Sequence, residues 1–319
     1  MRVAVFGGTG FVGSHLVDAL IGAGMQPVLL VRPGHEAKVR QREACHLVEG
    51  DVGRPEAVNE ALAQADAAIY NIGILRESPA RGVTFEELQF KAPRRIIDAA
   101  AHLGVNRFML MSANGVCADG TPYQRSKYQA ERHLEASGLD WTAFRPSVIF
   151  GDPRGRMEFA SQLVRDIVSS PLPAPLFYPG VLPMGAGGFQ LSPVHVEDVA
   201  QAMVRTLADP AWHGRTLHLG GPEALSWREI IARLAAATGR RKTMVPVPAL
   251  GLAGAAALLD RFESFPITRD QLRMLLQGNV CPPDDLEALG ITPRPFAGEH
   301  LAYLAGKARE DGAWQNRAA

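Results

Sequence analysis

The feature that most constrains this fold is a strand that runs directly into a glycine turn and then a helix. Residues 2–6, RVAVF, are a short apolar run typical of a buried strand, and GGTGFVG follows at 7–13. The first glycine permits a positive φ, the next lets the main chain approach a pyrophosphate, and the third lets helix and strand pack closely. The bare amides of the helix N-terminus favour phosphate charge. The dinucleotide-binding residues predicted here are Gly7, Thr9, Gly10, Phe11, Val12 and Gly13.

The first half of the chain alternates short apolar strands with amphipathic helices. This alternation indicates a parallel sheet with crossover helices. We predict strands at 2–6, 27–31, 46–50, 67–72, 107–112 and 141–145, and helices at 11–23, 54–64, 84–103 and 122–137. A further strand, RTLHLGG at 215–221, is expected to return to the sheet. The predicted class is α/β, a doubly wound parallel sheet of the Rossmann type with a smaller, mainly helical C-terminal substrate lobe.

The texture of the sequence changes near residue 150. Residues 171–193 are rich in proline and glycine, as expected for a long lid-like loop. Helical patterns follow at 226–239, near 250 and at 268–278. The predicted organisation is an NAD(P)-binding domain at 1–150, to which 194–222 returns, and a smaller substrate or docking lobe at 151–193 and 223–319.

Charge and cysteine usage argue against several functional classes. The 319 residues carry 33 basic and 33 acidic side chains, and this balance argues against a broad nucleic-acid-binding surface. Cys45, Cys117 and Cys281 lack CxxC spacing, so neither a disulfide framework nor a zinc site is indicated. We therefore predict no metal and no nucleic-acid partner.

Neither a signal peptide nor a membrane span is expected from the sequence. MRVAVFGG already forms the first strand and turn, and VPVPALGLAGAAALL at 245–259 is shorter than the roughly 20 residues that a span needs. The prediction is a cytoplasmic protein, with a peripheral position at the inner face of a membrane as the alternative.

The end of the second strand bears on the choice of nucleotide. A site selective for NAD(H) usually places an acidic residue here to hold the ribose hydroxyls. This chain has Arg32, 19 residues after Gly13, and a guanidinium suits a 2′-phosphate. NADP(H) is therefore preferred over NAD(H), with a solvated surface cation as the other interpretation of Arg32. Asp51 and Val52 follow the third strand and are predicted to meet the adenine, unless Asp51 simply caps the next helix.

The segment TPYQRSKYQAE at 121–131 holds the strongest catalytic signal. Thr121 is a helix N-cap, Pro122 takes the first helical position and Gly138 follows the end. Tyr123 and Lys127 are then one turn apart and share a helix face. They could perform chemistry on a nucleotide cofactor or form an ordinary polar pair.

Several motifs in order resemble the extended and atypical short-chain dehydrogenases/reductases, of the NAD-dependent epimerase/dehydratase type. The later FPITRDQLRMLLQGNV and LGITP resemble the complex I alpha-subcomplex subunit nine family, including its bacterial relatives. The resemblance covers nearly the whole chain. The shared motifs are GGTGFVG, AAIYNIGIL, RFMLMSANGV, YQRSK, RPSVIFG and VHVEDVA.

The resemblance implies catalytic roles for the tyrosine and the lysine. Tyr123 would be the proton donor or acceptor, and Lys127 would hold the nicotinamide ribose and lower the pKa of Tyr123. A nearby ammonium does favour a phenolate over its ordinary pKa of about 10. Catalytic families also place Ser or Thr two residues beyond the serine that ends the fifth strand, and here that position is Asn114. An amide lacks the dual donor and acceptor capacity of a hydroxyl, so Ser112 is the other candidate.

The resemblance also concerns the surroundings of the nicotinamide. Gln89 stands where many relatives carry an asparagine that supports the lysine through water. Asn71 and Gly73 follow the fourth strand, where the backbone passes the cofactor, and a purely structural role for them is equally favoured. Pro146 to Val148 would lie beside the nicotinamide amide, and Ser112, Tyr123 and Lys127 would contact the cofactor.

Two hypotheses follow. In the first, the chain is an NADP(H)-dependent oxidoreductase or epimerase that acts on a small apolar or isoprenoid-like carbonyl or alcohol. In the second, it is a non-catalytic accessory, assembly or redox-sensing protein whose C-terminal lobe docks on a respiratory, complex I-like assembly or at a membrane surface. The intact Tyr123–Lys127 pair favours the first hypothesis, and Asn114 favours the second.

Overall fold

Seven short apolar strands form one fully parallel sheet in the computed structural model, which describes residues 1–178, 180, 182–249, 268–282 and 284–305. Most of their side chains are buried on both faces, as expected for strands covered by helices on either side. The strand order is β11-β6-β5-β4-β1-β2-β3. These strands are β1 (Arg2–Phe6), β2 (Gln26–Val31), β3 (His46–Glu49), β4 (Ala67–Tyr70), β5 (Arg107–Met111), β6 (Asp140–Pro146) and β11 (Arg215–Leu219).

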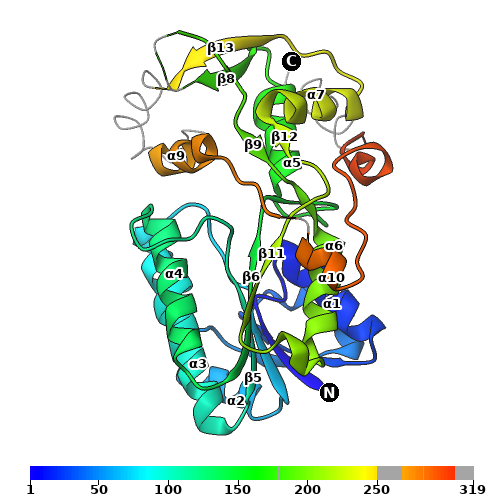
Figure 1. The fold of residues 1–319 in the computed structure, drawn as a ribbon. Coiled ribbons are helices and arrows are strands. Elements are labelled where there is room, and N and C mark those ends of the chain that lie inside the picture. The colour runs from blue at the N-terminus through cyan, green and yellow to red at the C-terminus, as the bar shows by residue number, and fades with distance from the viewer. Residues whose placement is uncertain (179, 181, 250–267, 283, 306–319) are drawn as a thin grey trace. The chain divides into compact units, whose positions relative to one another are not determined.

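Helices cover both faces of this sheet. Figure 1 shows α3 and α4 on one face, with α1 and α6 on the other. The helices are α1 (Phe11–Gly22), α2 (Pro55–Leu62), α3 (Ala92–Leu103), α4 (Pro122–Glu135), α6 (Val196–Leu207) and α10 (Asp284–Ala288). The direction of winding reverses between β1 and β4, and ligands of doubly wound sheets bind at such a switch point, beyond the carboxyl ends of the strands.

The predicted elements of this sheet are confirmed, with one local difference. The helix expected over 84–103 begins as a π-helix, η4 (Glu86–Lys91), before α3 continues it. Isolated π turns are rare and often lie at functional sites. Shorter 3-10 helices lie at η1 (Glu36–Lys38), η2 (Arg42–Ala44), η3 (Pro79–Arg81), η6 (Pro210–Trp212) and η7 (Gly298–Leu301).

The chain divides into two units, and the sheet belongs to the first. The first unit comprises Met1–Pro146, Val196–Leu219 and Asp284–Thr292. It therefore includes α10, whose Asp285 carboxylate accepts a hydrogen bond from the main-chain amide of His218 on β11 at 2.6 Å. The second unit comprises the described residues of Ser147–His195, Gly220–Pro283 and Pro293–Ala319.

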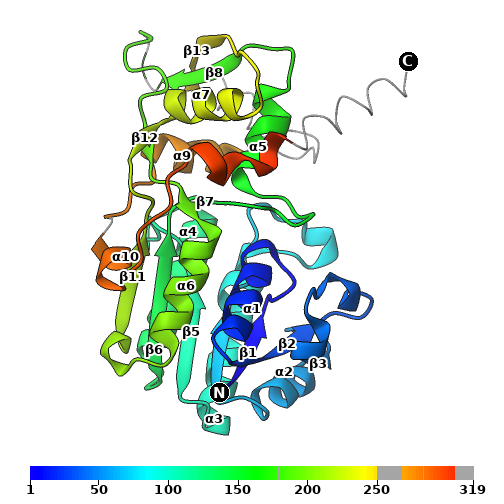
Figure 2. The same ribbon diagram turned by 90° about the vertical axis from the view of Figure 1, so that its right-hand side faces the viewer.

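The second unit combines helices with three short strand pairings, which are β7 with β10, β9 with β12, and β8 with β13; Figure 2 shows the last of these. The helices expected at 226–239 and 268–278 are present, each with a capping box, and the apolar segment expected near 250 lies largely outside the described residues. The elements are β7 (Ile149–Phe150), α5 (Phe159–Leu163), η5 (Val164–Val168), β8 (Ala174–Tyr178), β9 (Gln190–Leu191), β10 (Val194–His195), β12 (Leu225–Ser226), α7 (Trp227–Ala237), β13 (Met244–Pro248) and α9 (Arg269–Gln277).

Candidate active site

The glycine turn joins β1 to α1, where the sequence predicts a diphosphate site. Gly7 has φ +100°, a conformation that L side chains rarely adopt. A Cβ on Gly13 would lie 2.0 Å from the carbonyl oxygen of Gly7, so only glycine allows this approach of helix and turn. Gly10 is the N-cap of α1, and no side chain caps the helix. Because the helix has no side-chain cap, its first main-chain amides can donate hydrogen bonds to an external acceptor such as an anionic phosphate.

The three side chains predicted next to these glycines remain compatible with a bound phosphate. Thr9, Phe11 and Val12 are all half-buried. The Phe11 ring packs edge-on against His15, with centroids 5.8 Å apart, and its carbonyl accepts a hydrogen bond from the Ser14 hydroxyl at 2.9 Å. These contacts between residues of α1 itself stabilise the first turn of the helix.

The residues predicted for the adenosine end differ in exposure. Arg32 directly follows β2 and is exposed, and its guanidinium has no hydrogen bond or ion pair to the described residues. The Asp51 carboxylate accepts a hydrogen bond from the Gly53 amide at 2.9 Å. The N-cap of α2 is Arg54, so the alternative in which Asp51 caps that helix is wrong. Val52 is 8% exposed and packs in the apolar core, which leaves Arg32 and Asp51 as the accessible polar groups.

The loop after β4 lies next to both the glycine turn and helix α4. The amide of Asn71 donates to the carbonyl of Phe6 at 2.9 Å, and a Cβ on Gly7 would lie 2.9 Å from the carbonyl oxygen of Asn71. Two residues further on, a Cβ on Gly73 would lie 3.9 Å from Nζ of Lys127. The structure thus brings Gly7, Asn71, Gly73 and Lys127 together, although the last lies 120 positions from the first.

Helix α4 begins with the predicted cap. The Thr121 hydroxyl accepts from the Gln124 amide, and the Gln124 side chain accepts from the Thr121 amide at 2.9 Å, which completes a capping box. Gln124 also donates to the carbonyl of Gly115 at 2.8 Å and so ties the helix to the loop after β5. The first turn of α4, which carries Tyr123, is therefore fixed by its own side chains.

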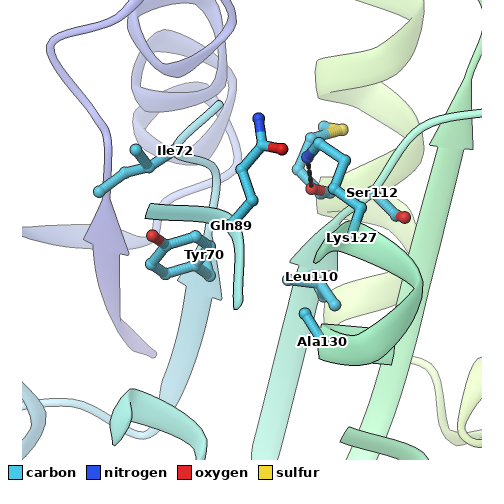
Figure 3. A pocket seen from close by; sticks show the side chains of 8 residues that line it. Tyr70, Ile72, Gln89, Leu110, Ser112, Lys127 and Ala130 are labelled. Carbon is cyan, nitrogen blue, oxygen red and sulfur yellow. Dashed lines mark hydrogen bonds between the residues drawn. The ribbon is translucent and has the colours of Figure 1, made fainter. Parts of the chain in front are cut away.

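Lys127 is a buried lysine with a fixed position. Its side chain is 6% exposed, and Nζ donates to the carbonyl of Met111 at 2.9 Å, at the end of β5 (Figure 3). Burial lowers the pKa of Lys127 to about 8, although the nearby Glu131 carboxylate opposes this shift. The ammonium is thus held at the carboxyl end of the sheet, and it remains protonated at neutral pH.

Tyr123 lies beside this lysine, with Nζ of Lys127 5.8 Å from the ring centroid. The ring also packs edge-on against Phe85, with centroids 5.7 Å apart. The expectation that Lys127 lowers the pKa of Tyr123 is wrong for this structure, because burial raises the pKa of the phenol above its ordinary value. Tyr123 therefore holds its proton at neutral pH.

Gln89 lies in the π-helix and supports the loop after β4. It is 2% exposed; its amide nitrogen donates to the carbonyl of Ile74 at 2.8 Å and its oxygen accepts from the Ser126 hydroxyl at 3.1 Å. Its amide oxygen and nitrogen thus join α4 to the loop that contains Gly73. Figure 3 shows the narrow crevice around these groups, which is lined by Tyr70, Ile72, Gln89, Leu110, Met111, Ser112, Lys127 and Ala130.

The two candidates for the serine position differ in their contacts. Ser112 is 4% exposed, and its hydroxyl finds no hydrogen-bond partner in the part of the chain that the structure describes. The Asn114 side-chain oxygen lies 3.3 Å from Nδ1 of His218, and the main-chain amide of Asn114 donates to the carbonyl of Pro146 at 2.9 Å. A buried hydroxyl without a partner is costly, so Ser112 fits a ligand that supplies one.

The last two predicted contacts fall in different units. Pro146 ends β6 in the first unit, whereas Val148 belongs to the second, where its carbonyl accepts from the Val194 amide at 3.0 Å. The contact of Val148 with a cofactor therefore stays a prediction.

Sequence reasoning missed the ion pair behind Lys127. Glu131 is 1% exposed and binds the Arg145 guanidinium at two points, with distances of 3.0 and 2.5 Å. Its spacing of four residues from Lys127 on α4 was a usable signal, but the partner on β6 was not visible. Together, the uncapped α1 turn, the unpartnered Ser112 hydroxyl and the anchored lysine fit a nicotinamide dinucleotide.

Among the described residues, no group of three or more His, Cys, Asp or Glu side chains could hold a metal ion. None of the helices in this part of the chain has the length and hydropathy of a membrane span.

Comparison with known proteins agrees with this geometry. A protein-family model described as NAD(P)H-binding matches residues 7–166, just over half of the chain, and the match begins at the glycine turn. The chain belongs to this NAD(P)H-binding family.

Individual relatives extend over nearly the whole chain. The 40 kDa subunit of mitochondrial NADH-ubiquinone oxidoreductase from Neurospora crassa is 25% identical over 308 residues, which cover 94% of this chain and 78% of the subunit. The NAD(P)H azoreductase of Xenophilus azovorans is 26% identical over 313 residues, covering 94% and 98%. The resemblance stated from the sequence motifs is confirmed.

A solved structure shows the same fold. UDP-glucose 4-epimerase of Thermus thermophilus, in complex with NAD, superimposes with a TM-score of 0.69 over 97% of this chain and 99% of the epimerase. The sequence identity is 21%, so this likeness establishes the Rossmann-type α/β fold alone.

Proposed function

We propose that this protein is an NADP(H)-dependent oxidoreductase that reduces a carbonyl group on a small apolar or isoprenoid-like substrate. The observation that carries the proposal is the continuous set of contacts from the phosphate turn to the catalytic pair. Gly7 meets Asn71, Gly73 meets Lys127, and Lys127 lies beside Tyr123. A nicotinamide dinucleotide supplies or accepts a hydride when bound.

The residues of the first unit divide the work of holding this cofactor. The first amides of α1 would hold the pyrophosphate, with Thr9, Phe11 and Val12 around them. Arg32 would pair with the 2′-phosphate, and Asp51 would meet the adenosine. Lys127, with its cation fixed by Met111, would donate to the ribose hydroxyls. Pro146 would border the nicotinamide.

The protonation of the catalytic pair suits reduction. A phenol is protonated at neutral pH even at its ordinary pKa of about 10, and burial raises the pKa of Tyr123 further, so its hydroxyl carries a proton that it can donate. It would donate to the substrate oxygen as negative charge develops there. Lys127 is cationic below its pKa of about 8 and stabilises that charge from the same helix face. The Ser112 hydroxyl, whose partner is missing among the described residues, would hydrogen-bond the same substrate oxygen.

Tyr123→Phe tests the catalytic step. The substitution removes the donated proton but retains the ring that packs on Phe85, so carbonyl-dependent NADPH oxidation should fall by about 100-fold or more. The dissociation constant for NADPH, measured by calorimetry, should change little. A screen of apolar aldehydes and ketones in which both proteins turn over equally would contradict the proposal.

Arg32→Glu tests the cofactor preference separately. Removing the cation and adding a carboxylate should weaken NADPH binding by about tenfold or more and leave NADH binding equal or stronger. Arg54→Glu, an exposed control at the N-cap of α2, should leave the ratio of the two affinities unchanged. An unchanged ratio in Arg32→Glu would refute the NADP(H) assignment.

Asn114 supports a second candidate, a non-catalytic nucleotide-binding accessory protein of a respiratory assembly. Its side-chain oxygen faces His218 where catalytic families carry a hydroxyl, and one relative is named as an NADH-ubiquinone oxidoreductase subunit. In this case the protein would lie in the cytoplasm at the inner face of a membrane. Recovery of a respiratory complex by affinity capture, together with no Tyr123-dependent turnover, would decide for this candidate.

A further inference from the structure

The loop that follows β2 brings a second basic side chain next to Arg32. Strands β1 and β2 pair in parallel, so Arg32, the first residue after β2, leaves the sheet at the same edge as the glycine turn after β1 (Figure 2). The chain then reverses, because the His35 amide donates to the carbonyl of Arg32 at 3.0 Å. Pro33 and Gly34 take the two central positions, and Gly34 has φ +77°, which is the pattern of a type II turn. The ends of such a turn lie within about 7 Å, so Arg32 and His35 are neighbours.

The side chains of Arg32 and His35 are both accessible to a ligand. Arg32 is exposed and His35 is half-buried, and neither side chain has a hydrogen bond or an ion pair within the described part of the chain. The acid of the same loop, Glu36, accepts a hydrogen bond from the Gly34 amide at 3.1 Å. A guanidinium and an imidazole, two groups that bind phosphate, thus lie side by side next to the glycine turn.

The charges around His35 are those expected of an anion site. Partial burial lowers the pKa of His35 below its usual value, the Lys38 and Arg32 cations lower it further, and the Glu36 carboxylate opposes them. A bound dianion reverses this shift, because negative charge favours the protonated imidazole. Between the lowered pKa of the free protein and the raised pKa of the complex, binding must therefore take up a proton at His35.

We propose that His35 is a second ligand for the 2′-phosphate of NADP(H) and makes the preference for NADPH over NADH depend on pH. A phosphate monoester carries about −1.5 to −2 charges near neutral pH and three acceptor oxygens. The Arg32 guanidinium can bind two of these oxygens through parallel hydrogen bonds, which leaves an acceptor for a protonated His35. NADH has a hydroxyl at this position and gains nothing from a second cation.

The role of His35 rests on the proposed preference for NADP(H), but the two can fail separately. Arg32→Glu tests the phosphate site as a whole, whereas His35→Gln keeps the guanidinium and removes only the group that titrates. If Arg32→Glu reverses the preference and His35→Gln changes nothing, the NADP(H) assignment stands and the role of His35 is refuted.

The test is calorimetric titration of the full chain with NADPH and with NADH between about pH 6.5 and about pH 8. In the wild type, the affinity for NADPH relative to NADH should fall by about tenfold as the pH rises, because His35 loses its charge. His35→Gln should lower NADPH affinity by about tenfold at the acidic end, change it little at the basic end and leave NADH affinity unchanged. His35→Lys, a cation throughout this range, should bind NADPH tightly without the pH dependence.

Proton uptake supplies a measurement that a merely structural role of His35 would not change. Titrations in buffers of different ionisation enthalpy count the protons bound with the ligand. At about pH 7.5 the phosphate, with its pKa of about 6, is mostly ionised before and after binding, so the uptake reports on the protein. NADPH should bring more protons than NADH to the wild type, and this excess should vanish in His35→Gln.

His102→Gln is the matched control, since His102 is an exposed histidine in the last turn of α3. It should bind both nucleotides and take up protons as the wild type does. Equal proton uptake in the wild type and in His35→Gln, or a wild-type ratio of NADPH to NADH affinity that does not change with pH, would overturn the proposal.

Discussion

The N-termini of α1 and α4 solve the same problem in opposite ways. Every helix starts with amides that have no partner within the helix. At α4 the chain supplies one, because Thr121 and Gln124 form a reciprocal capping box. At α1 the N-cap is Gly10, which has no side chain to cap the helix. The capped helix has a fixed first turn that carries Tyr123, whereas the uncapped helix presents its amides to a ligand.

The difference shows which helix N-termini of this protein are fixed by their own side chains. Helices α7 and α9 of the second unit also carry capping boxes, formed by Ser226 with Glu229 and by Thr268 with Gln271. Helix α2, whose N-cap is Arg54, also lacks a side-chain cap, so an uncapped start does not by itself identify a ligand site. Where α1 lacks a cap, the glycines at 7 and 13 hold the turn by close main-chain packing instead.

The largest effect is expected at α1 from Gly13→Ala. The added Cβ would lie 2.0 Å from the carbonyl oxygen of Gly7, so the helix must shift away from the turn. Displacing the amides by about 1 Å should weaken NADPH binding on the order of 100-fold, and the overpacking should destabilise the fold by about 1–3 kcal/mol.

Gly22→Ala on the same helix is the matched control. A Cβ there meets nothing within 4 Å, so it should leave binding unchanged and stabilise the fold by about 0.5–1 kcal/mol. Calorimetry and urea unfolding measure both effects. Equal affinities of the two variants would remove the glycine turn from the phosphate site.

The next effect concerns the loss of folding stability caused by burying the Lys127 ammonium on α4. The pKa of Lys127 is about 8 in the folded protein and about 10.4 when unfolded, so between these values the unfolded chain binds more protons. Stability must then rise with pH from about 8 to about 10.4, and the penalty is fully present below pH 8. Lys127→Met should remove this rise and stabilise the protein at pH 7 by about 2 kcal/mol.

Urea unfolding between pH 7 and pH 10 measures this difference. Lys91→Met is the control, because Lys91 lies in η4 as a surface ion pair with Glu86. If wild type and Lys127→Met show the same pH profile, burial does not perturb this lysine.

A side-chain cap added to α1 should weaken binding more moderately. Gly10→Asp places a carboxylate at the N-cap, where it can accept from the helix amides and repel phosphate charge. NADPH affinity should fall by about tenfold, while the stability of the free protein should stay equal or rise by a few tenths of a kcal/mol. Gly10→Ala adds the Cβ without a cap, and an equal loss in this control would mean that steric effects dominate.

The smallest effect is expected when α4 loses its cap. Thr121→Ala should cost about 1 kcal/mol of stability and lower turnover several-fold, because Tyr123 lies in the freed turn. Ser226→Ala opens the corresponding box on α7 and should cost similar stability at unchanged turnover. Thermal unfolding and NADPH oxidation report the two quantities. Equal turnover in both variants would show that the cap of α4 has no influence on the site.

Much of the fold and part of the site could be predicted because their signals are local. Apolar runs and glycine spacing defined the strands and the first turn, and Thr121, Pro122 and Gln124 lie next to the helix that they begin. The pairing of Tyr123 with Lys127 follows from helical periodicity alone. Two strand pairings of the second unit escaped prediction because their strands are only two residues long, and β8 with β13 escaped because prolines interrupt both five-residue strands.

By itself the sequence determined the parallel sheet, the bare amides of α1, the capped start of α4 and the shared face of Tyr123 and Lys127. Hydrogen bonds between neighbouring residues and the alternation of apolar side chains encode these features. Only the tertiary structure decided the partners of Lys127 and Gln89, the ion pair between Glu131 and Arg145, and the rise of the Tyr123 pKa. Burial and contacts between distant segments depend on what packs across the sheet, and no short stretch of sequence contains that information.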